Sequence, residues 1–246
     1  MKTELIIRSN SSDIDFALLK DGKLTALNKE TNGNKFSVGD IFLAKIGKVL
    51  SGLNASFVNV GYEKDGFLHY QDLGAQLLSL NKFIKGISTG KIKDYTLNNF
   101  QLEKDIDKNG TIVDALKTGQ NSLVQIVKEP ISTKGPRMSS EISIAGRYMV
   151  LVPFSDRVSV SQKITDLEEK ERLKRLVKSI KPKGFGLIIR TVAVNKKVAE
   201  LDRDIQNSLE RWLVMCKKIK AVKAQQTPIK VLSELNRASS ILRDLF

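Results

Sequence analysis

The sequence predicts an α+β protein in which a small β-barrel is followed by a region of mixed helices and strands. Short alternations of apolar and polar residues, separated by turns that contain glycine, recur through residues 38–73, as expected for strands with one buried face. Amphipathic helical patterns and the nearly all-apolar strand Gly186–Ile189 follow in the second half. With 246 residues, the chain has the length of about one or two domains and can bury a real core.

The chain opens with a predicted β-hairpin unit, residues 1–36. Its candidate strands are Glu4–Ser9, Asp15–Lys20 and Lys23–Leu27. The pair Asp21-Gly22 joins the last two, and Asp-Gly between apolar runs is a strong signal for a tight hairpin turn. We therefore expect an antiparallel unit ahead of the barrel.

The predicted barrel covers residues 37–140. Its strands, in order, are Ile41–Ile46, Ala55–Val60, Gly66–His69 and Ser122–Lys128. Short strands with tight turns and scattered glycines are typical of a small Greek-key barrel. The segment 74–110 interrupts this rhythm and carries several lysines, Lys82, Lys85, Lys91 and Lys93. We interpret it as a solvated basic insertion, a loop or a short helix, in preference to an extension of a binding surface.

Two aromatic residues, Phe57 and Phe67, lie on neighbouring strands of this barrel. Polar side chains that can carry positive charge occur around them, Lys45, Lys48, Lys64 and His69. Aromatic faces among cations form a platform on which unpaired bases stack while phosphates are neutralised. Alternation alone does not say which face of a strand is wet, so a core position for either ring is an equally good interpretation.

Residues 141–225 alternate strands and helices. A strand is expected at Arg147–Val152, and the capping box Thr165-x-x-Glu168 opens a helix. After the strand Gly186–Ile189 comes a long amphipathic helix, in which we interpret Trp212 and Cys216 as core residues. A last helix is predicted from an apolar periodicity, Val231, Leu235, Ala238 and Leu242.

Arg190 and Thr191 stand where the apolar strand ends. The planar fork of an arginine grips a phosphate through two parallel hydrogen bonds, and a threonine adds a hydroxyl. Gly146 lacks a Cβ, so its backbone N–H could approach a phosphate closely. As a pattern alone, however, an arginine at a strand end is more often a surface or salt-bridge residue.

The composition favours a polyanionic partner. Lys and Arg number 41 against 27 Asp and Glu, which gives a formal net charge of +14. Nucleic acid is the commonest partner of such a surplus, and an anionic membrane surface is the competitor. No run approaches the ~20 apolar residues of a spanning helix, and the N-terminus lacks the apolar run of a signal peptide, so we expect a soluble cytoplasmic protein. One cysteine and one histidine exclude a disulfide framework and a Cys- or His-rich metal site within the chain.

The order GLNASFVNVG at Gly52–Gly61, followed by DGFLH, resembles the OB-fold RNA-binding domain of the S-one type. More narrowly it resembles the version in the RNase E/G family of bacterial endoribonucleases. The strings SIAGRYMVLV and GFGLIIRTVA are similar to the 5′-sensor domain of that family. The resemblance implies an OB-fold barrel at 37–140, inserted in an incomplete RNase H-like subdomain at 1–36 and 226–246, and an α/β 5′-sensor domain at 141–225.

The resemblance also implies roles for individual residues. In the family, residues matching Phe57 and Phe67 contact RNA bases, and lysines matching Lys128 and Lys134 lie beside them. The residues that match the 5′-monophosphate pocket, which surrounds the phosphate and the first base, are Gly146, Val150, Arg190 and Thr191. Members with a strong sensor carry an Arg-Arg pair before the capping-box helix, where this chain has Ser161-Gln162-Lys163. That difference puts in doubt any additional positive charge that would attract RNA toward the pocket, though not the binding of phosphate by Arg190 and Thr191.

The family resemblance predicts binding of single-stranded RNA and sensing of its 5′-monophosphate end in RNA processing and decay, including rRNA maturation and mRNA decay. The last stretch, Asn236–Phe246, resembles the connection into a DNase I-like catalytic domain. In the full-length family that domain holds magnesium, and a later Cys-pair motif lets two subunits share zinc. We find no convincing acidic metal cluster among Asp202, Asp204 and the other acids, so we expect no catalytic residue and no cleavage by this chain alone. The alternative is a stand-alone RNA-binding or ribosome-associated module without a nuclease role.

Overall fold

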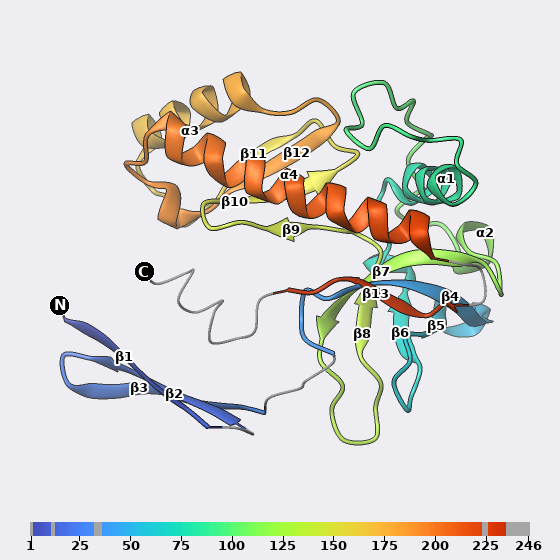
Figure 1. Cartoon of the computed structure of the whole chain (residues 1–246), viewed down its shortest axis with the longest axis horizontal. Helices are drawn as coiled ribbons and strands as arrows, with labels where there is room; N and C mark the ends of the chain where they lie inside the picture. Colours follow the sequence, from blue (N-terminus) through green and yellow to red (C-terminus); the bar gives the residue numbers. More distant parts are fainter. Residues whose placement is uncertain (1, 11–12, 32–35, 223–225, 235–246) are drawn as a thin grey trace.

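The computed structural model describes residues 2–10, 13–31, 36–222 and 226–234. Along the chain come a three-stranded sheet, a barrel and a four-stranded sheet covered by helices (Figure 1). Along the described ranges, no helix combines the length and the apolar character that crossing a membrane requires.

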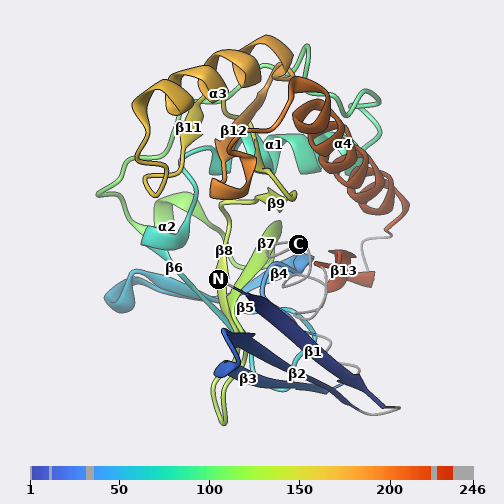
Figure 2. The same ribbon diagram turned by 90° about the vertical axis from the view of Figure 1, so that its left-hand side faces the viewer.

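The first sheet is an antiparallel meander. Its strands are β1 (Thr3–Ser9), β2 (Asp13–Lys20) and β3 (Lys23–Thr31), as the hairpin prediction expects. Asp21 and Gly22 both have positive φ, +48° and +76°, which is the conformation of a two-residue hairpin turn. Figures 1 and 2 show this sheet to one side of the barrel strands. Its assignment as part of an RNase H-like subdomain stays a prediction.

The second sheet closes into a five-stranded barrel. Its strands are β4 (Ile41–Leu50), β5 (Ala55–Asn59), β6 (Gly66–His69), β8 (Arg137–Ser139) and β7 (Asn121–Lys128), in that spatial order, with β7 pairing back to β4. The alternating residues that point inward are buried, for example Ile46, Val58 and Leu68. This closed barrel is consistent with the predicted OB-fold. β8 was not predicted, because it is three residues long and follows a loop rich in turn residues.

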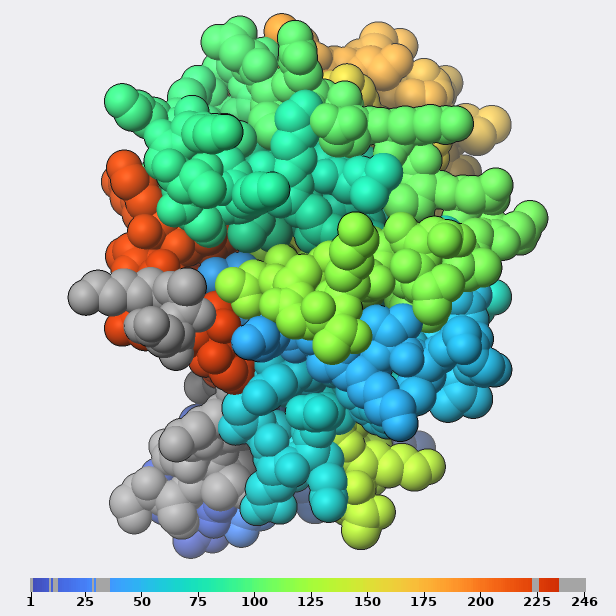
Figure 3. Space-filling view, turned by 90° about the vertical axis from the view of Figure 1, so that its right-hand side faces the viewer, coloured from blue at the N-terminus to red at the C-terminus, as the bar shows by residue number. Residues whose placement is uncertain are grey.

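The segment 74–110 corrects the sequence interpretation of a solvated insertion. It contains α1 (Leu77–Ser88), and residues 112–115 form the short α2 (Ile112–Ala115). Phe83 on α1 is 1% exposed and stacks on the buried Trp212 with ring centroids 5.6 Å apart. Figure 3 shows the segment, coloured teal to green, above the barrel strands. The lysines occupy only its outer surface, while the apolar face of α1 joins the barrel to the third part of the chain.

The third part is a four-stranded sheet in the order β11-β12-β10-β9. Its strands are β9 (Ile144–Ala145), β10 (Met149–Pro153), β11 (Val158–Val160) and β12 (Phe185–Ile189). Two helices, α3 (Leu167–Ile180) and α4 (Val198–Ala221), pack on one face of this sheet (Figure 2). Trp212 and Cys216 on α4 are fully buried, as predicted, and burial raises the pKa of the Cys216 thiol.

The start of α3 differs from the predicted capping box by one residue. Asp166, and not Thr165, is the N-cap, and its carboxylate accepts hydrogen bonds from the backbone N–H groups of Glu168 and Glu169. An aspartate caps a helix as well as a threonine does and adds a negative charge that favours the helix N-terminus.

The carboxylate of Glu169 ties α3 to the loop before α4. It accepts hydrogen bonds from Arg172 Nη2 at 2.7 Å and from the backbone N–H of Asn195 at 2.8 Å. The Arg172 guanidinium, aided by the Asn195 amide, lowers the pKa of Glu169 from its ordinary 4.5 to about 2.

Acid is expected to remove the contribution of Glu169 to stability. Because the folded-state pKa is depressed, this contribution is present above pH 4.5 and is lost as the pH falls through about 2. Glu169→Gln is expected to lower the free energy of unfolding at neutral pH by about 2 kcal/mol and to flatten its pH dependence in that window. Urea unfolding at several pH values measures this, with the exposed Glu168→Gln as the control. Equal pH dependence in the wild type and Glu169→Gln would contradict it.

The last described strand corrects one prediction. β13 (Ile229–Leu232) pairs antiparallel with β4, so Val231 lies in a strand and not in a helix. The assignment of 226–246 to an RNase H-like subdomain stays a prediction. On the side of β4 that faces β5, residues Ile41–Leu43 have no β5 partner, because β5 pairs only from Lys45 onward. β13 pairs with β4 there. Lys230 Nζ also reaches the buried Asp40 at 2.5 Å. Leu235, Ala238 and Leu242 lie outside the described residues.

Candidate nucleic-acid interface

Phe57 and Phe67 form one pair on the outer face of the barrel. They are direct partners across β5 and β6, and their ring centroids are 6.1 Å apart in an edge-to-face arrangement. The next residue on each strand, Val58 and Leu68, is fully buried, so the two rings are on the opposite, half-exposed face. His69 adds a third ring, 6.4 Å from Phe67. This is the location that a stacking platform requires; contact with bases stays a prediction.

The lysines predicted beside the platform come from β7 and the loop after it. Lys128 ends β7 opposite Arg137, and Lys134 lies in the loop that leads to β8; both side chains are exposed. This loop packs closely on the turn before β6, since a Cβ on Gly135 would lie 2.1 Å from the carbonyl oxygen of Asp65. The backbone N–H of Phe67 then donates to the carbonyl of Pro136 at 2.8 Å. The loop that carries Lys134 is therefore attached to the strand that carries Phe67.

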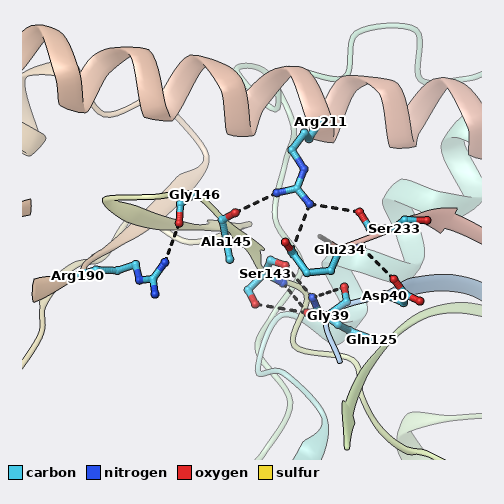
Figure 4. A network of polar contacts seen from close by, with 10 residues as sticks. All are labelled: Gly39, Asp40, Gln125, Ser143, Ala145, Gly146, Arg190, Arg211, Ser233 and Glu234. Atoms are coloured by element: carbon cyan, nitrogen blue, oxygen red, sulfur yellow. Dashed lines mark hydrogen bonds and ion pairs between the residues drawn. The ribbon is translucent and has the colours of Figure 1, made fainter. Parts of the chain in front are cut away.

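Arg190 and Gly146 meet at one edge of the third sheet. β12 ends at Ile189, so Arg190 and Thr191 follow the strand end as predicted, and Thr191 is exposed. Arg190 Nη1 donates to the carbonyl of Gly146 at 2.9 Å (Figure 4). The structure differs from the prediction that the Gly146 N–H approaches a phosphate. This N–H donates to the Met149 carbonyl at 2.8 Å and so points toward β10.

A buried carboxylate holds the turn that contains Gly146. Asp204 on α4 is 8% exposed and accepts hydrogen bonds from the backbone N–H groups of Arg147, Tyr148 and Met149 at 2.8, 2.8 and 3.0 Å. A Cβ on Gly146 would lie 2.5 Å from Asp204 Oδ2, so only glycine allows this close approach. The sequence indicated Asp204 only as an acid on an amphipathic helix. Its partners are more than 50 residues earlier in the chain, which no local pattern reveals.

Further polar side chains gather at the same edge. Arg147 Cζ and Lys196 Nζ are each 5.4 Å from the centroid of the Tyr148 ring, and sequence reasoning missed both. The stretch Ser161–Lys163, where the resemblance described above implies an arginine pair, is also at this edge, since β11 runs parallel to β12 and the Ser161 N–H donates to the Ile189 carbonyl.

A groove runs between the barrel and the uncovered face of the third sheet. Its volume is about 940 Å³, and its walls include Lys128 and Ile131 from the barrel side and Val150 and Ile188 from the sheet. One predicted RNA-binding residue and one predicted pocket residue therefore share a groove. Polar contacts at this junction, for example Gln125 Nε2 to the Ser143 carbonyl at 2.9 Å, link the barrel to the strand before Gly146 (Figure 4).

Within the parts of the chain that the structure describes, no three His, Cys, Asp or Glu side chains are grouped as a metal ion would require.

Comparisons with known proteins point to one family. The Ribonuclease E/G family matches over residues 143–246. Ribonuclease G of Escherichia coli (strain K12) is 30% identical over 244 residues, which are 99% of this chain and 45% of that protein. Ribonuclease E of Synechocystis sp. is 35% identical over 176 residues, 71% of this chain and 22% of that protein. The Ribonuclease E/G-like protein of Pyropia yezoensis is 33% identical over 212 residues, 86% of this chain and 36% of that protein.

The chain thus spans less than half the length of each of these three relatives. The family match includes the whole edge that carries Gly146, Arg190 and Asp204, and the similarity to Ribonuclease G extends over the barrel as well. This chain belongs to the Ribonuclease E/G family.

Proposed function

We propose that this chain binds single-stranded RNA and recognises its 5′-monophosphate end, as the recognition part of an RNase E/G-type endoribonuclease that acts in RNA processing and decay. The barrel holds the strand through stacking on Phe57 and Phe67, with Lys128 and Lys134 near the phosphates. Arg190 and Thr191 hold the terminal phosphate. Recognition, and not cleavage, is the role proposed for these residues.

The observation that carries the proposal is the position of Arg190. Its guanidinium is fixed at the strand end by the Gly146 carbonyl, on a turn that Asp204 holds through backbone hydrogen bonds. A pre-positioned guanidinium loses little conformational entropy when it binds an anion. Val150 lies on β10 beside this edge, half-buried and facing the groove, where an apolar side chain suits the face of a base.

The barrel surface and the terminal-phosphate site recognise different features of the RNA. Stacking on the barrel contributes about 1–3 kcal/mol per base and tolerates every base, so it selects single strands and not sequences. A charge-assisted contact to a terminal phosphate contributes about 1.5–3 kcal/mol and depends on the chemistry of the 5′ end. The proposal therefore separates strand binding from end sensing, and the two can be measured separately.

Replacing Arg190 by alanine is expected to remove end sensing and to leave strand binding. Fluorescence anisotropy at fixed salt compares a short labelled RNA carrying a 5′-monophosphate with the same RNA carrying a 5′-hydroxyl. In the wild type the phosphate is expected to tighten binding by about 10- to 100-fold, and Arg190→Ala is expected to erase this difference while the 5′-hydroxyl RNA binds as before.

The matched control is Arg157→Ala, because Arg157 stands just before β11, at the opposite end of the same sheet. It removes the same charge and is expected to keep the 5′-phosphate preference. Equal binding of the two RNAs to the wild type would exclude end sensing. If Arg190→Ala and Arg157→Ala lose the 5′-phosphate preference equally, the preference depends only on the net charge of the protein.

A further inference from the structure

Two cations are held against one buried aromatic ring at the edge of the third sheet where Arg190 and Gly146 meet. Tyr148 is 9% exposed, and both Arg147 Cζ and Lys196 Nζ are 5.4 Å from its ring centroid. Arg147 is exposed, and the Lys196 side chain is 34% exposed, so solvent reaches both charges. A phosphate in solvent can therefore approach the positive charge of either side chain.

These cations adjoin Arg190. The Arg190 N–H donates to the Tyr148 carbonyl at 2.9 Å, and its Nη1 also approaches the Arg147 carbonyl at 3.4 Å. Arg147, Tyr148 and Arg190 are therefore parts of one compact turn and strand end. Lys196 comes six residues after Arg190 and packs back on the same turn.

The cations are placed by the fold and not by chance packing of surface chains. The Asp204 carboxylate fixes the turn through the backbone N–H groups of Arg147 and Tyr148. Lys196 Nζ is 3.2 Å from Glu200 Oε1, and this hydrogen bond is the main cause that raises the pKa of Lys196. α4 begins at Val198, so the positive end of its dipole adds to the field.

We propose that Arg147 and Lys196 form a second phosphate subsite. It binds the phosphate of the ligand that is next to the terminal phosphate held by Arg190. The inference rests on the proposed function of Arg190 and deepens it. The ligand is a phosphate group that is covalently joined to the terminal one. It is either the first phosphodiester of the RNA, joined through the first nucleoside, or the second phosphate of a 5′-diphosphate end. In the stretch Ser161-Gln162-Lys163 only Lys163 carries a positive charge, and this subsite adds positive charge at the same edge.

Three small probes test the subsite with the full chain at fixed salt: uridine 5′-monophosphate, uridine 5′-diphosphate and a 5′-phosphorylated uridine dinucleotide. Dissociation constants from NMR titration are compared for the wild type, Arg147→Gln and Lys196→Gln. In the wild type, a probe with a second phosphate is expected to bind about tenfold more tightly than the monophosphate. Each variant is expected to lose most of this gain, whereas its affinity for the monophosphate changes by less than about twofold.

Two further variants separate this role from simple alternatives. Lys178→Gln removes a lysine in the last turn of α3, at the other end of the sheet, and is expected to keep the full gain. Lys196→Arg keeps the charge and is expected to keep most of the gain, which ties the gain to the charge of this side chain. Thermal unfolding of each variant confirms that the fold is retained.

The results show which ligand supplies the second phosphate, and they separate failure of the subsite from failure of the proposed function of Arg190. A gain with the dinucleotide alone assigns the subsite to the phosphodiester, and a gain with the diphosphate alone assigns it to a modified 5′ end. The subsite is overturned if the wild type shows no gain, or if Arg147→Gln and Lys196→Gln weaken all three probes equally. If Arg190→Ala leaves monophosphate binding unchanged but the second-phosphate gain still depends on Lys196, the proposed function of Arg190 fails and the subsite stands.

Discussion

Asp204→Ala is expected to lower the free energy of unfolding by about 3–5 kcal/mol and to abolish the 5′-phosphate preference. The carboxylate is the acceptor for three consecutive backbone N–H groups, those of Arg147, Tyr148 and Met149. Alanine leaves these donors without that acceptor next to a buried helix face, and each buried unsatisfied donor costs about 1–3 kcal/mol. The turn also carries Gly146, whose carbonyl positions Arg190. Stability and end sensing are therefore expected to fall together.

Two neighbouring substitutions make this test specific. Asp202→Asn lies two residues away on α4, where the side chain accepts a hydrogen bond only from Gln206 at 3.3 Å among the contacts described, and it is expected to change stability little. Asp204→Asn keeps one oxygen but turns an N–H₂ donor toward another donor, so an intermediate loss is expected. Urea unfolding and RNA anisotropy measure both properties. An Asp204→Ala protein as stable as Asp202→Asn would show that the carboxylate does not hold the turn.

The contrast between Arg190 and Asp204 shows what the sequence reveals about the site. The position of Arg190 at the end of an all-apolar strand could be predicted, because strand ends can be recognised from local patterns, whereas its phosphate-binding role comes from the family resemblance and stays a prediction. Asp204 and Lys196 act on residues far earlier in the chain, and their partners become visible only when α4 packs across the sheet. For Gly146 the prediction that its N–H approaches a phosphate differs from the structure, where this N–H donates to the Met149 carbonyl. The space that a Cβ would fill is occupied by the Asp204 carboxylate, a partner that no local pattern indicates.

The same distinction applies to the fold. β4 and β7 contain apolar runs and β6 alternates buried and half-buried residues, patterns that the sequence displays directly. In contrast, β8 and β13 are short, and β13 pairs with a strand far earlier in the chain. For α1 the sequence allowed a short helix, and the incorrect part of the prediction was its exposure to solvent. Leu80, Phe83, Ile84 and Ile87 have the spacing of a buried helix face, so the signal was present, but the lysines between them directed the interpretation toward solvent.

Replacing Phe57 and Phe67 together by alanine is expected to weaken binding of 5′-hydroxyl RNA by about 30- to 1,000-fold. Each ring is half-exposed on the outer face of the barrel, so a base can reach it. Removing two stacking partners costs about 2–4 kcal/mol if each contributes toward the lower part of the usual range. The edge-to-face pair contributes about 0.5–1.5 kcal/mol to stability beyond the apolar area that the two half-buried rings cover, so thermal unfolding of the double variant is measured alongside RNA binding.

The double leucine variant, Phe57→Leu with Phe67→Leu, separates stacking from apolar bulk. Leucine keeps most of the buried area of the strand pair but has no π-face, so the RNA affinity is expected to fall nearly as far as in the alanine variant. The 5′-phosphate preference is expected to survive in both, since Arg190 lies in a different sheet. Wild-type affinity in both double variants would mean that RNA does not bind this face of the barrel. Loss of affinity together with loss of the phosphate preference would mean that end sensing requires the strand to be held on the barrel first, because a weakly held strand rarely presents its 5′ end to Arg190.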